Sequence, residues 1–297
     1  MTPGHRFLSA ELAVCTGMDA IEEMYEEWAA GKGRGDDHWG DVTGEPGGVD
    51  YLEVSAGGVP AMWLRPHEAA PGRAIVAVHG GGFVGGSLYS HRKMYGHLAK
   101  AVGVPVLLAT YRHTPEFQYP AQIDDVETAY RWVRDQGLRT VLAADSAAAQ
   151  LVVHTALRAP GAEALLLISP WLDTDRALAA TSYDTNAATD TFFTRPMIRA
   201  LIDAYLPDGV SGTDPAVNVL NADLSGLPPV FVQAGGAEGP LGEGERLVKL
   251  VADAGVEARL DVFAGRLHTF QMAAGYSAEA DEAIGRFAAW TRPRLGL

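Results

Sequence analysis

One serine of the sequence lies where a predicted strand passes into a predicted helix. Ser146 stands in the segment ADSAA (144–148), after the apolar run Thr140 to Ala143 and at the start of the helical pattern Ala147 to Arg158. This arrangement is typical of a nucleophile elbow, in which small residues two before and two after the serine let the chain turn tightly. Both of those positions are alanine, so G-x-S-x-G has become A-x-S-x-A. The alternative is a serine or aspartate that only caps the helix.

A run of glycines after another apolar run is suited to binding negative charge. His79 opens the segment HGGG (79–82), directly after the apolar run 74–78. Consecutive glycines can present bare backbone N–H groups to a developing oxyanion, because no Cβ obstructs the substrate. The stretch also spells G-x-G-x-x-G, but the next strand ends in Tyr111 and Arg112 and offers no acid for a ribose. We therefore expect an oxyanion hole and no nucleotide cofactor.

His268 is the histidine best placed to act as a base for Ser146. It follows the apolar run Ala258 to Phe263 and precedes a C-terminal helical segment, so its loop can reach a serine at the end of a central strand. The order of serine before histidine agrees with this role. The remaining histidines considered are expected to be structural, and His91 and His97, six residues apart, lack a carboxylate partner at metal-ligand spacing, so we expect no metal site. They are His91, His97, His113 and His154.

Short apolar runs alternate with helical patterns through most of the chain. Strands that are apolar throughout and separated by helices predict a parallel sheet covered on both faces. The expected strands are Ala74 to Val78, Val104 to Thr110, Thr140 to Ala143, Ala164 to Ile168, Pro229 to Gln233 and Ala258 to Phe263. The expected helices include Tyr95 to Val102, Asp124 to Asp135, Ala147 to Arg158 and Gly244 to Ala254.

Two segments do not follow this alternation and predict a helical cap. Residues 16–30 carry apolar side chains at helical spacing, with Thr16 and Asp19 as a capping pair and Gly31 as a stop. Residues 178–212 form a second helical insertion between two strands. Packing on the outside of the core is the alternative for both. We expect residues 46–177 and 213–297 to form the core, and residues 1–45 and 178–212 the cap.

Composition excludes several classes of function. A formal net charge of −14 argues against binding to nucleic acid or to anionic membranes, both of which need a basic face. No stretch approaches the roughly 20 apolar residues that span a bilayer, and the first fifteen residues lack a signal-peptide pattern, so we expect a cytoplasmic protein. Cys15 is the single cysteine, which excludes a disulfide within the chain. The partner expected is a small-molecule substrate, and the oligomeric state is left open, a homodimer included.

These segments, in this order, resemble the hormone-sensitive-lipase family of α/β-hydrolases, which includes small bacterial esterases. The motifs that carry the resemblance are HGGGFVGGS (79–87), YRHTPEFQYPAQIDDV (111–126), ADSAAAQL (144–151), LLISPWLD (166–173), DLSGLPPVFVQAGG (223–236) and the histidine loop 265–271. The resemblance covers nearly the whole chain. It implies an α/β-hydrolase fold, with a mostly parallel eight-stranded sheet, helices on both faces and a helical cap.

The resemblance also implies roles for residues. It implies Ser146 as nucleophile, His268 as base, and the backbone N–H groups of Gly81, Gly82 and Ala147 as oxyanion donors. It implies that four charged residues near the elbow are structural neighbours and not catalysts. They are Arg112, Glu116, Asp124 and Asp125.

The acid of the family is missing from its usual position. The alignment puts Ala237 where the aspartate belongs, in the loop after Pro229 to Gln233. An alanine cannot orient an imidazole, and loss of the acid typically costs about 10⁴ in rate. Three carboxylates could replace it, namely Glu238, Glu243 and Asp173, and the fourth alternative is that no acid is present.

The function predicted first is hydrolysis of a carboxylic ester of a small, largely apolar molecule through an acyl-enzyme. Two alternatives keep the fold. One is a non-hydrolytic tailoring enzyme, such as a cyclase or lyase, that uses His268 and the oxyanion hole. The other is a ligand-binding protein, as in the plant hormone receptors built on this scaffold. The altered elbow and the missing aspartate favour both alternatives more than the family alone would.

Overall fold

The computed structural model describes residues 17–32 and 36–297, and for residues 36–38 only the backbone. Cys15 and Thr16 lie outside the described residues. Eight strands form one sheet in the order β1-β2-β4-β3-β5-β6-β7-β8. β2 pairs antiparallel with β1 and with β4, and the other neighbouring strands are parallel, so only β2 runs against the rest. This confirms the predicted eight-stranded, mostly parallel sheet. The strands are β1 (Val49–Ala56), β2 (Val59–Pro66), β3 (Arg73–Val78), β4 (Val106–Ala109), β5 (Arg139–Asp145), β6 (Leu165–Ile168), β7 (Val230–Gly235) and β8 (Ala258–Phe263).

The central strands are apolar on both sides because helices cover both faces of the sheet. Every residue of β4, β6 and β7 is buried, whereas β1 alternates between partly buried and exposed positions. The apolar runs in the sequence therefore predicted the six strands β3 to β8, but they predicted neither β1 nor β2. A signal for these two was present in Gly57-Gly58, because two glycines with positive φ form the tight turn of a β-hairpin.

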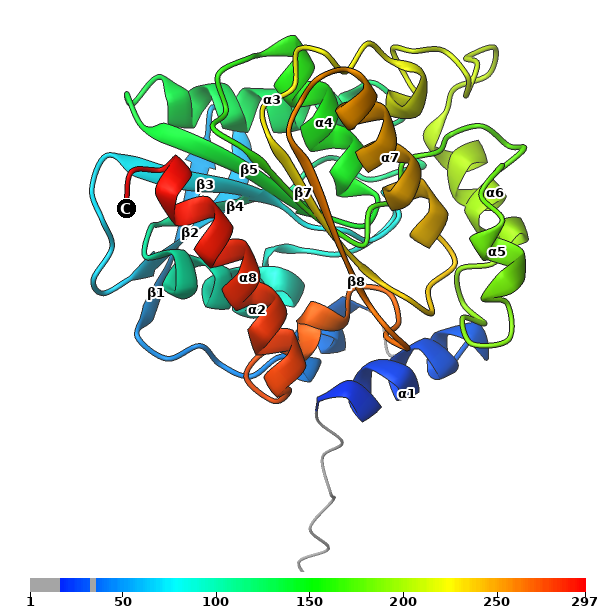
Figure 1. The fold of residues 1–297 in the computed structure, drawn as a ribbon, viewed down its shortest axis with the longest axis horizontal. Helices are drawn as coiled ribbons and strands as arrows, with labels where there is room; N and C mark the ends of the chain where they lie inside the picture. The colour runs from blue at the N-terminus through cyan, green and yellow to red at the C-terminus, as the bar shows by residue number, and fades with distance from the viewer. Residues whose placement is uncertain (1–16, 33–35) are drawn as a thin grey trace, which may run out of the picture.

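Helices lie on both faces of the sheet (Figure 1). α2 and α8 pack together on one face, α3 and α4 pack on each other on the opposite face, and α7 lies against β7 and β8. The helices are α1 (Met18–Ala29), α2 (Leu88–Val102), α3 (Ala121–Arg134), α4 (Ala148–Arg158), α5 (Ser182–Thr185), α6 (Arg195–Tyr205), α7 (Leu241–Asp253) and α8 (Ala278–Arg294). Short 3₁₀ turns are η1 (Asp36–Val42), η2 (Val219–Asn221) and η3 (Phe270–Ala273).

α1, α5 and α6 come from the two segments that do not follow the alternation. Figure 1 shows α1 beside the end of β8, and α5 and α6 together at one side of the molecule. α1 begins at Met18 after Gly17, which has no side chain to cap it, and the predicted capping pair of Thr16 and Asp19 includes a residue outside the described part of the chain. Gly31, with φ of 67°, follows the end of α1 as predicted, because glycine tolerates the left-handed conformation that stops a helix.

Candidate active site

Ser146 lies on a strained turn between β5 and α4. Its φ is 53°, in the left-handed region that residues other than glycine rarely adopt. The turn is held from both sides, because Ser146 N donates to Ile168 O at 2.9 Å and Trp171 N donates to Ser146 O at 3.1 Å. Ala144 and Ala148, in the two positions usually occupied by glycine, are fully buried. A tight strand-to-helix turn therefore forms here with alanine at both positions.

Ser146, His268 and Glu238 are joined by two hydrogen bonds. His268 Nε2 lies 2.8 Å from Ser146 Oγ, and His268 Nδ1 lies 2.9 Å from Glu238 Oε2. All three residues are buried. Because a carboxylate oxygen only accepts, Nδ1 carries the hydrogen, and the lone pair of Nε2 faces the serine hydroxyl. Ser146 and His268 are 122 positions apart in the chain, and the ends of β5 and β8 in the sheet bring their two loops together.

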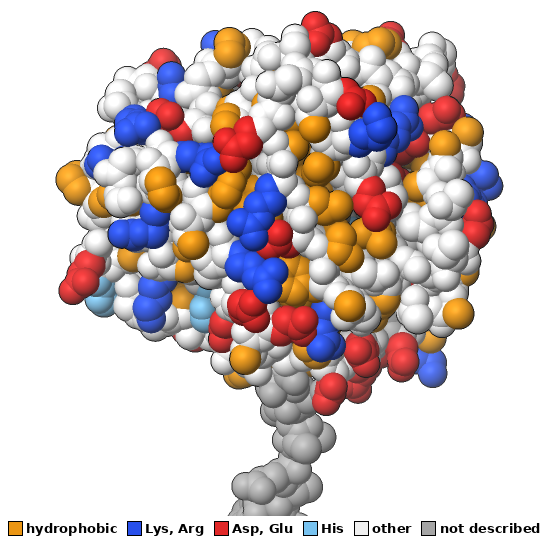
Figure 2. Space-filling view, in the orientation of Figure 1, with side chains coloured by type: hydrophobic (Ala, Val, Ile, Leu, Met, Phe, Trp, Pro, Cys, Tyr) orange, Lys and Arg blue, Asp and Glu red, His pale blue; other side chains and the backbone are white. Residues whose placement is uncertain are grey.

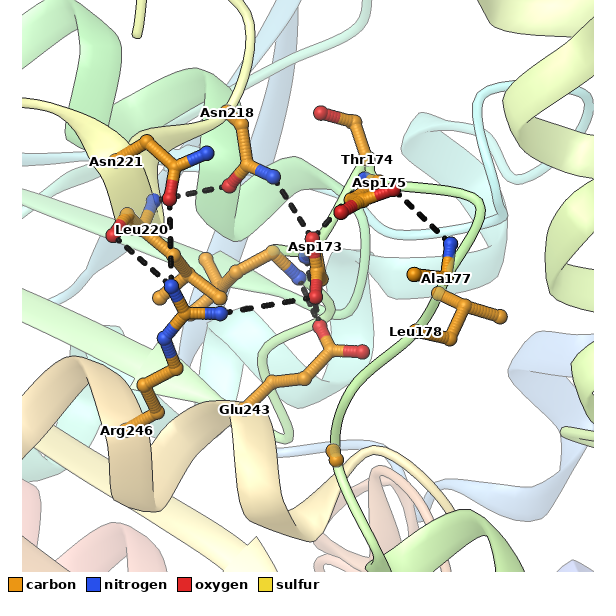
Figure 3. Close-up of polar contacts among 12 residues, drawn as sticks. Asp173, Thr174, Asp175, Ala177, Leu178, Asn218, Leu220, Asn221, Glu243 and Arg246 are labelled. Carbon is orange, nitrogen blue, oxygen red and sulfur yellow. Dashed lines mark hydrogen bonds and ion pairs between the residues drawn. The ribbon is translucent and has the colours of Figure 1, made fainter. Parts of the chain in front are cut away.

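The other two carboxylates considered from the sequence contact different groups (Figure 3). Glu243 Oε2 accepts from the backbone N–H groups of Leu172 at 2.6 Å and Asp173 at 2.8 Å, and its Oε1 accepts from the Tyr183 hydroxyl at 2.5 Å. Burial raises the pKa of Glu243 to about 8, although these donors oppose the rise. Asp173 Oδ1 accepts from Asn218 Nδ2 at 2.7 Å, and its Oδ2 lies 3.8 Å from Arg246.

The HGGG segment forms a loop beside Ser146. Gly81 and Gly82 have φ of 119° and 62°, and an added Cβ at Gly81 would lie 2.2 Å from Gly85 O, so a side chain does not fit there. Within the described chain, no acceptor is bound to the N–H groups of Gly81, Gly82 and Ala147. Gly81 and Gly82 line the same pocket as Ser146 and His268. Free N–H groups at such a position are available to an oxygen of a bound substrate.

A buried polar network lies behind this loop. Asp145 Oδ1 accepts from Gly80 N at 3.0 Å and from the Tyr95 hydroxyl at 2.8 Å. Its Oδ2 lies 3.3 Å from His91 Nε2, and neither side chain is exposed. Although burial opposes it, His91 and Tyr95 hold the pKa of Asp145 below its usual range.

His79 extends the network to Thr110, the residue after β4. Burial, and next the neighbouring His91, lower the pKa of His79 to about 3, so its ring is neutral. Nδ1 then donates to Gly80 O at 2.8 Å, and Nε2 accepts from the Thr110 hydroxyl at 2.8 Å. Sequence spacing did not reveal the pairing of His91 with a carboxylate, because Asp145 is far away in the chain and reaches it only through the fold.

A pocket of about 240 Å³ opens onto Ser146 and His268. Its wall is mostly aromatic and aliphatic and comes from three parts of the chain: the N-terminal segment, the glycine loop and the 178–212 insertion. The lining side chains outside the loop are Trp28, Trp39, Phe192, Phe193, Met197 and Leu201. The Phe193 ring lies 4.0 Å from the His268 ring, centroid to centroid. The pocket is therefore apolar except at the serine, the histidine and the backbone of the loop.

Five other residues singled out from the sequence have structural contacts. His97 and His154 hydrogen-bond to the backbone oxygens of Gly44 and Val217. Arg112 pairs with Asp125 at 2.8 Å, and Asp124 pairs with Arg158 at 3.0 Å.

Among the residues that the structure describes, no cluster of side chains could hold a metal ion. No helix in the same part of the chain is long and apolar enough to cross a membrane.

Known proteins resemble the chain in sequence and in structure. Residues 75–272 match the model of a family described by its alpha/beta hydrolase fold. The chain is 36% identical over 216 residues to an acetyl-hydrolase of Streptomyces hygroscopicus, with 69% of each chain covered. It is 31% identical over 248 residues to an esterase of Acinetobacter venetianus, with 81% of each covered. A crystal structure of an esterase from the bacterial hormone-sensitive lipase family superposes with a TM-score of 0.87 at 33% identity, covering 94% of this chain and 98% of the other.

Proposed function

Because the chain belongs to the hormone-sensitive-lipase family of α/β-hydrolases, we propose that it is a serine carboxylesterase acting on small, largely apolar esters. The observation that carries the proposal is the pair of hydrogen bonds from Glu238 through His268 to Ser146, at 2.9 and 2.8 Å, at the base of an apolar pocket. Serine, histidine and carboxylate in this arrangement are the groups that acyl transfer uses. The glutamate stands one residue beyond the position of the family's aspartate.

In the reaction, Ser146 Oγ attacks the ester carbonyl carbon while His268 Nε2 takes the hydroxyl proton. The carbonyl oxygen becomes an oxyanion, bound by the N–H groups of Gly81, Gly82 and Ala147. Collapse of the tetrahedral intermediate breaks the bond to the alcohol, which leaves with the proton from His268. Water then attacks the acyl-serine with His268 again as base, and the carboxylic acid is released. Glu238 holds the imidazole in the required tautomer and stabilises the imidazolium.

The pocket indicates the class of substrate. A volume of about 240 Å³ with aromatic walls suits a short acyl chain and a small apolar alcohol. Because Trp28, Phe192 and Phe193 belong to the predicted cap segments, the proposal includes the division into a core (46–177 and 213–297) and a cap (1–45 and 178–212). Cytoplasmic location stays a prediction of the sequence, which leaves the oligomeric state open, a homodimer included.

A non-hydrolytic enzyme and a ligand-binding protein were the alternatives, because the elbow glycines and the acid depart from the family pattern. The hydrogen-bonded acid and the intact strand-to-helix turn remove the reason for preferring them. The relatives named above are also hydrolases by name.

The test is turnover of short-chain nitrophenyl esters by the full chain, with Ser146→Ala as the variant. We expect ordinary turnover of about 1 s⁻¹ or more. Loss of the serine is expected to lower kcat by about 10⁶ and to abolish labelling by a fluorophosphonate. Exposed Ser225 offers a matched control, because Ser225→Ala should leave both readouts unchanged. Turnover at the parent rate in Ser146→Ala would exclude the serine mechanism, and a non-hydrolytic activity that survives in it would favour the cyclase class.

A further inference from the structure

The loop that carries Glu238 is bound to the 178–212 insertion through its backbone oxygens. We call residues 236–239 the acid loop and residues 178–212 the cap insertion. Asn186 Nδ2 donates to Gly236 O at 3.2 Å and to Glu238 O at 2.8 Å. Thr189 Oγ1 lies 3.1 Å from Ala237 O, and Ser182 Oγ donates to Gly239 O at 2.6 Å. Each carbonyl of the acid loop therefore has a partner on the cap insertion.

Asp190 connects the acid loop to the wall of the pocket. This buried carboxylate accepts from Gly239 N at 2.7 Å through Oδ2. Its Oδ1 accepts from Phe192 N at 3.2 Å and Phe193 N at 2.9 Å. One side chain thus joins the residue after Glu238 to the phenylalanine whose ring lies 4.0 Å from that of His268. Gly239 permits the close approach, because a Cβ there would lie 2.7 Å from Phe193 O.

Glu238 has few other hydrogen bonds to hold it. Within the described chain its buried Oε1 has no hydrogen-bond partner, and its N–H has only a long contact of 3.4 Å to Gly235 O. The sheet side of the acid loop is held through two backbone N–H groups, those of Gly236 and Ala237, which donate to Phe263 O and Arg266 O. Apart from its bond to His268, the strongest hydrogen bond of residue 238 is therefore the one from Asn186.

We propose that the cap insertion positions the Glu238 carboxylate against His268, with Asn186 as the principal positioning residue and Asp190 as the link to Phe193. This inference rests on the proposed function. Its physical basis is that only one oxygen of the Glu238 carboxylate is hydrogen-bonded, so the position of the carboxylate depends on the position of the backbone of residue 238. A shift of the acid loop by about 1 Å would cost about 10²-fold in rate.

The test compares Asn186→Ala in the wild-type and Glu238→Gln backgrounds, using kcat for a short-chain nitrophenyl ester. Asn186 does not line the pocket, so KM should change by no more than about twofold. In the wild-type background, kcat should fall by about 10- to 100-fold. In the Glu238→Gln background, the same change should alter kcat by no more than about twofold, because residues that act through one another are not additive. An equal fall in both backgrounds, or an unchanged kcat in Asn186→Ala, would overturn the proposal.

Asp203→Asn is the matched control. Asp203 lies on α6 in the same insertion and pairs with Arg176 on the surface, away from the acid loop. Its replacement should change kcat by no more than about twofold. If Asn186→Ala does not fold, Thr189→Val replaces it, since Thr189 is exposed and the change removes only its hydroxyl, which contacts Ala237 O at 3.1 Å and Asn186 O at 2.9 Å. The expected fall in kcat is then smaller, and the same non-additivity with Glu238→Gln applies.

A second readout separates this inference from the proposed function. The proton on His268 Nδ1, hydrogen-bonded to Glu238, should give a far-downfield proton NMR signal in the full chain and also in the inactive Ser146→Ala variant. Asn186→Ala should shift or broaden this signal, whereas Asp203→Asn should leave it unchanged. If no ester is turned over but the signal responds to Asn186→Ala, the proposed function fails and the positioning role stands. If esters are turned over and the signal is indifferent to Asn186, the positioning role fails alone.

Discussion

Ser146 and Glu238 lie on either side of one imidazole, and different parts of the molecule hold them. The serine is fixed by backbone bonds to the neighbouring loop and by the buried Asp145 network, which lies between β3, β5 and α2. The glutamate is fixed by side chains of the cap insertion. The position of Ser146 therefore depends on contacts within the core, whereas the position of Glu238 depends on the cap insertion. Loss of the core contacts should therefore lower the stability of the fold, whereas loss of the cap-insertion contacts should lower kcat.

Asp145→Ala is the sharpest test of the core side. It removes the acceptor of Gly80 N and the nearer of two acceptors of the Tyr95 hydroxyl, and it leaves His91 without its buried carboxylate. We expect the free energy of unfolding to fall by about 3 to 5 kcal/mol, as when one partner of a buried pair is removed. Urea unfolding at neutral pH measures the loss. If stability stays within about 1 kcal/mol of the parent while kcat falls, the two sides do not differ in the way described.

Glu243 joins the two sides, because it accepts from the β6 loop and from Tyr183 of the cap insertion. Burial raises the pKa of Glu243 to about 8 from an ordinary value of 4.5, so the folded state keeps a proton that the unfolded state loses. The contribution of Glu243 to the free energy of unfolding is therefore fully present below about pH 4.5, and it is lost as the pH rises to about 8.

Glu243→Gln cannot ionise and keeps an acceptor for the backbone donors. Relative to the parent, the variant should therefore gain stability by up to about 1.4 kcal/mol per pH unit across that window. Denaturant titrations at several pH values measure the difference, with the exposed Glu245→Gln as a control. A difference that does not depend on pH would show that Glu243 is ionised throughout.

Tyr25→Phe tests the contact of α1 with the histidine. The Tyr25 hydroxyl donates to His268 O at 2.9 Å and lies 2.9 Å from Thr269 Oγ1. Its loss should cost about 1 kcal/mol of stability and lower kcat by about 3- to 10-fold, because the histidine loop loses one anchor. The half-exposed Tyr276→Phe serves as a control that should change neither quantity. A parent-like kcat in Tyr25→Phe would show that α1 does not help to position His268.

Ala237→Asp should not raise the rate. It restores the family's aspartate beside a glutamate that already hydrogen-bonds to His268, so no gain is expected, and a second carboxylate crowded against the first should lower the rate by about 10-fold at most. Steady-state kcat measures the change. A rise of about 10²-fold would instead mean that the acid position is unfilled in the parent.

Much of this arrangement follows from the sequence, and the reasons for the exceptions are physical. The apolar runs from Ala74 to Gln233 predicted strands because both faces of the inner strands are buried, and the run Ala258 to Phe263 predicted β8 although that edge strand is only partly buried. Half-exposed β1 carries no such run. Ser146 and His268 stood out because each follows a strand, but three carboxylates were left as alternatives for the acid. Which of the three carboxylates contacts His268 depends on the path of the loop and the length of the side chain, and local sequence patterns do not show either. The contacts of Asn186 and Asp190 join segments about 50 residues apart and left no pattern.

The central claim is that Glu238 serves as the acid of a serine esterase, and kcat of Glu238→Gln on a short-chain nitrophenyl ester tests it most directly. Glutamine keeps the size of the side chain and removes the charge that stabilises the imidazolium. We predict a fall in kcat of about 10³ to 10⁴, with the exposed Glu282→Gln unchanged. A Glu238→Gln variant that folds and turns over the ester at the parent rate would contradict the account.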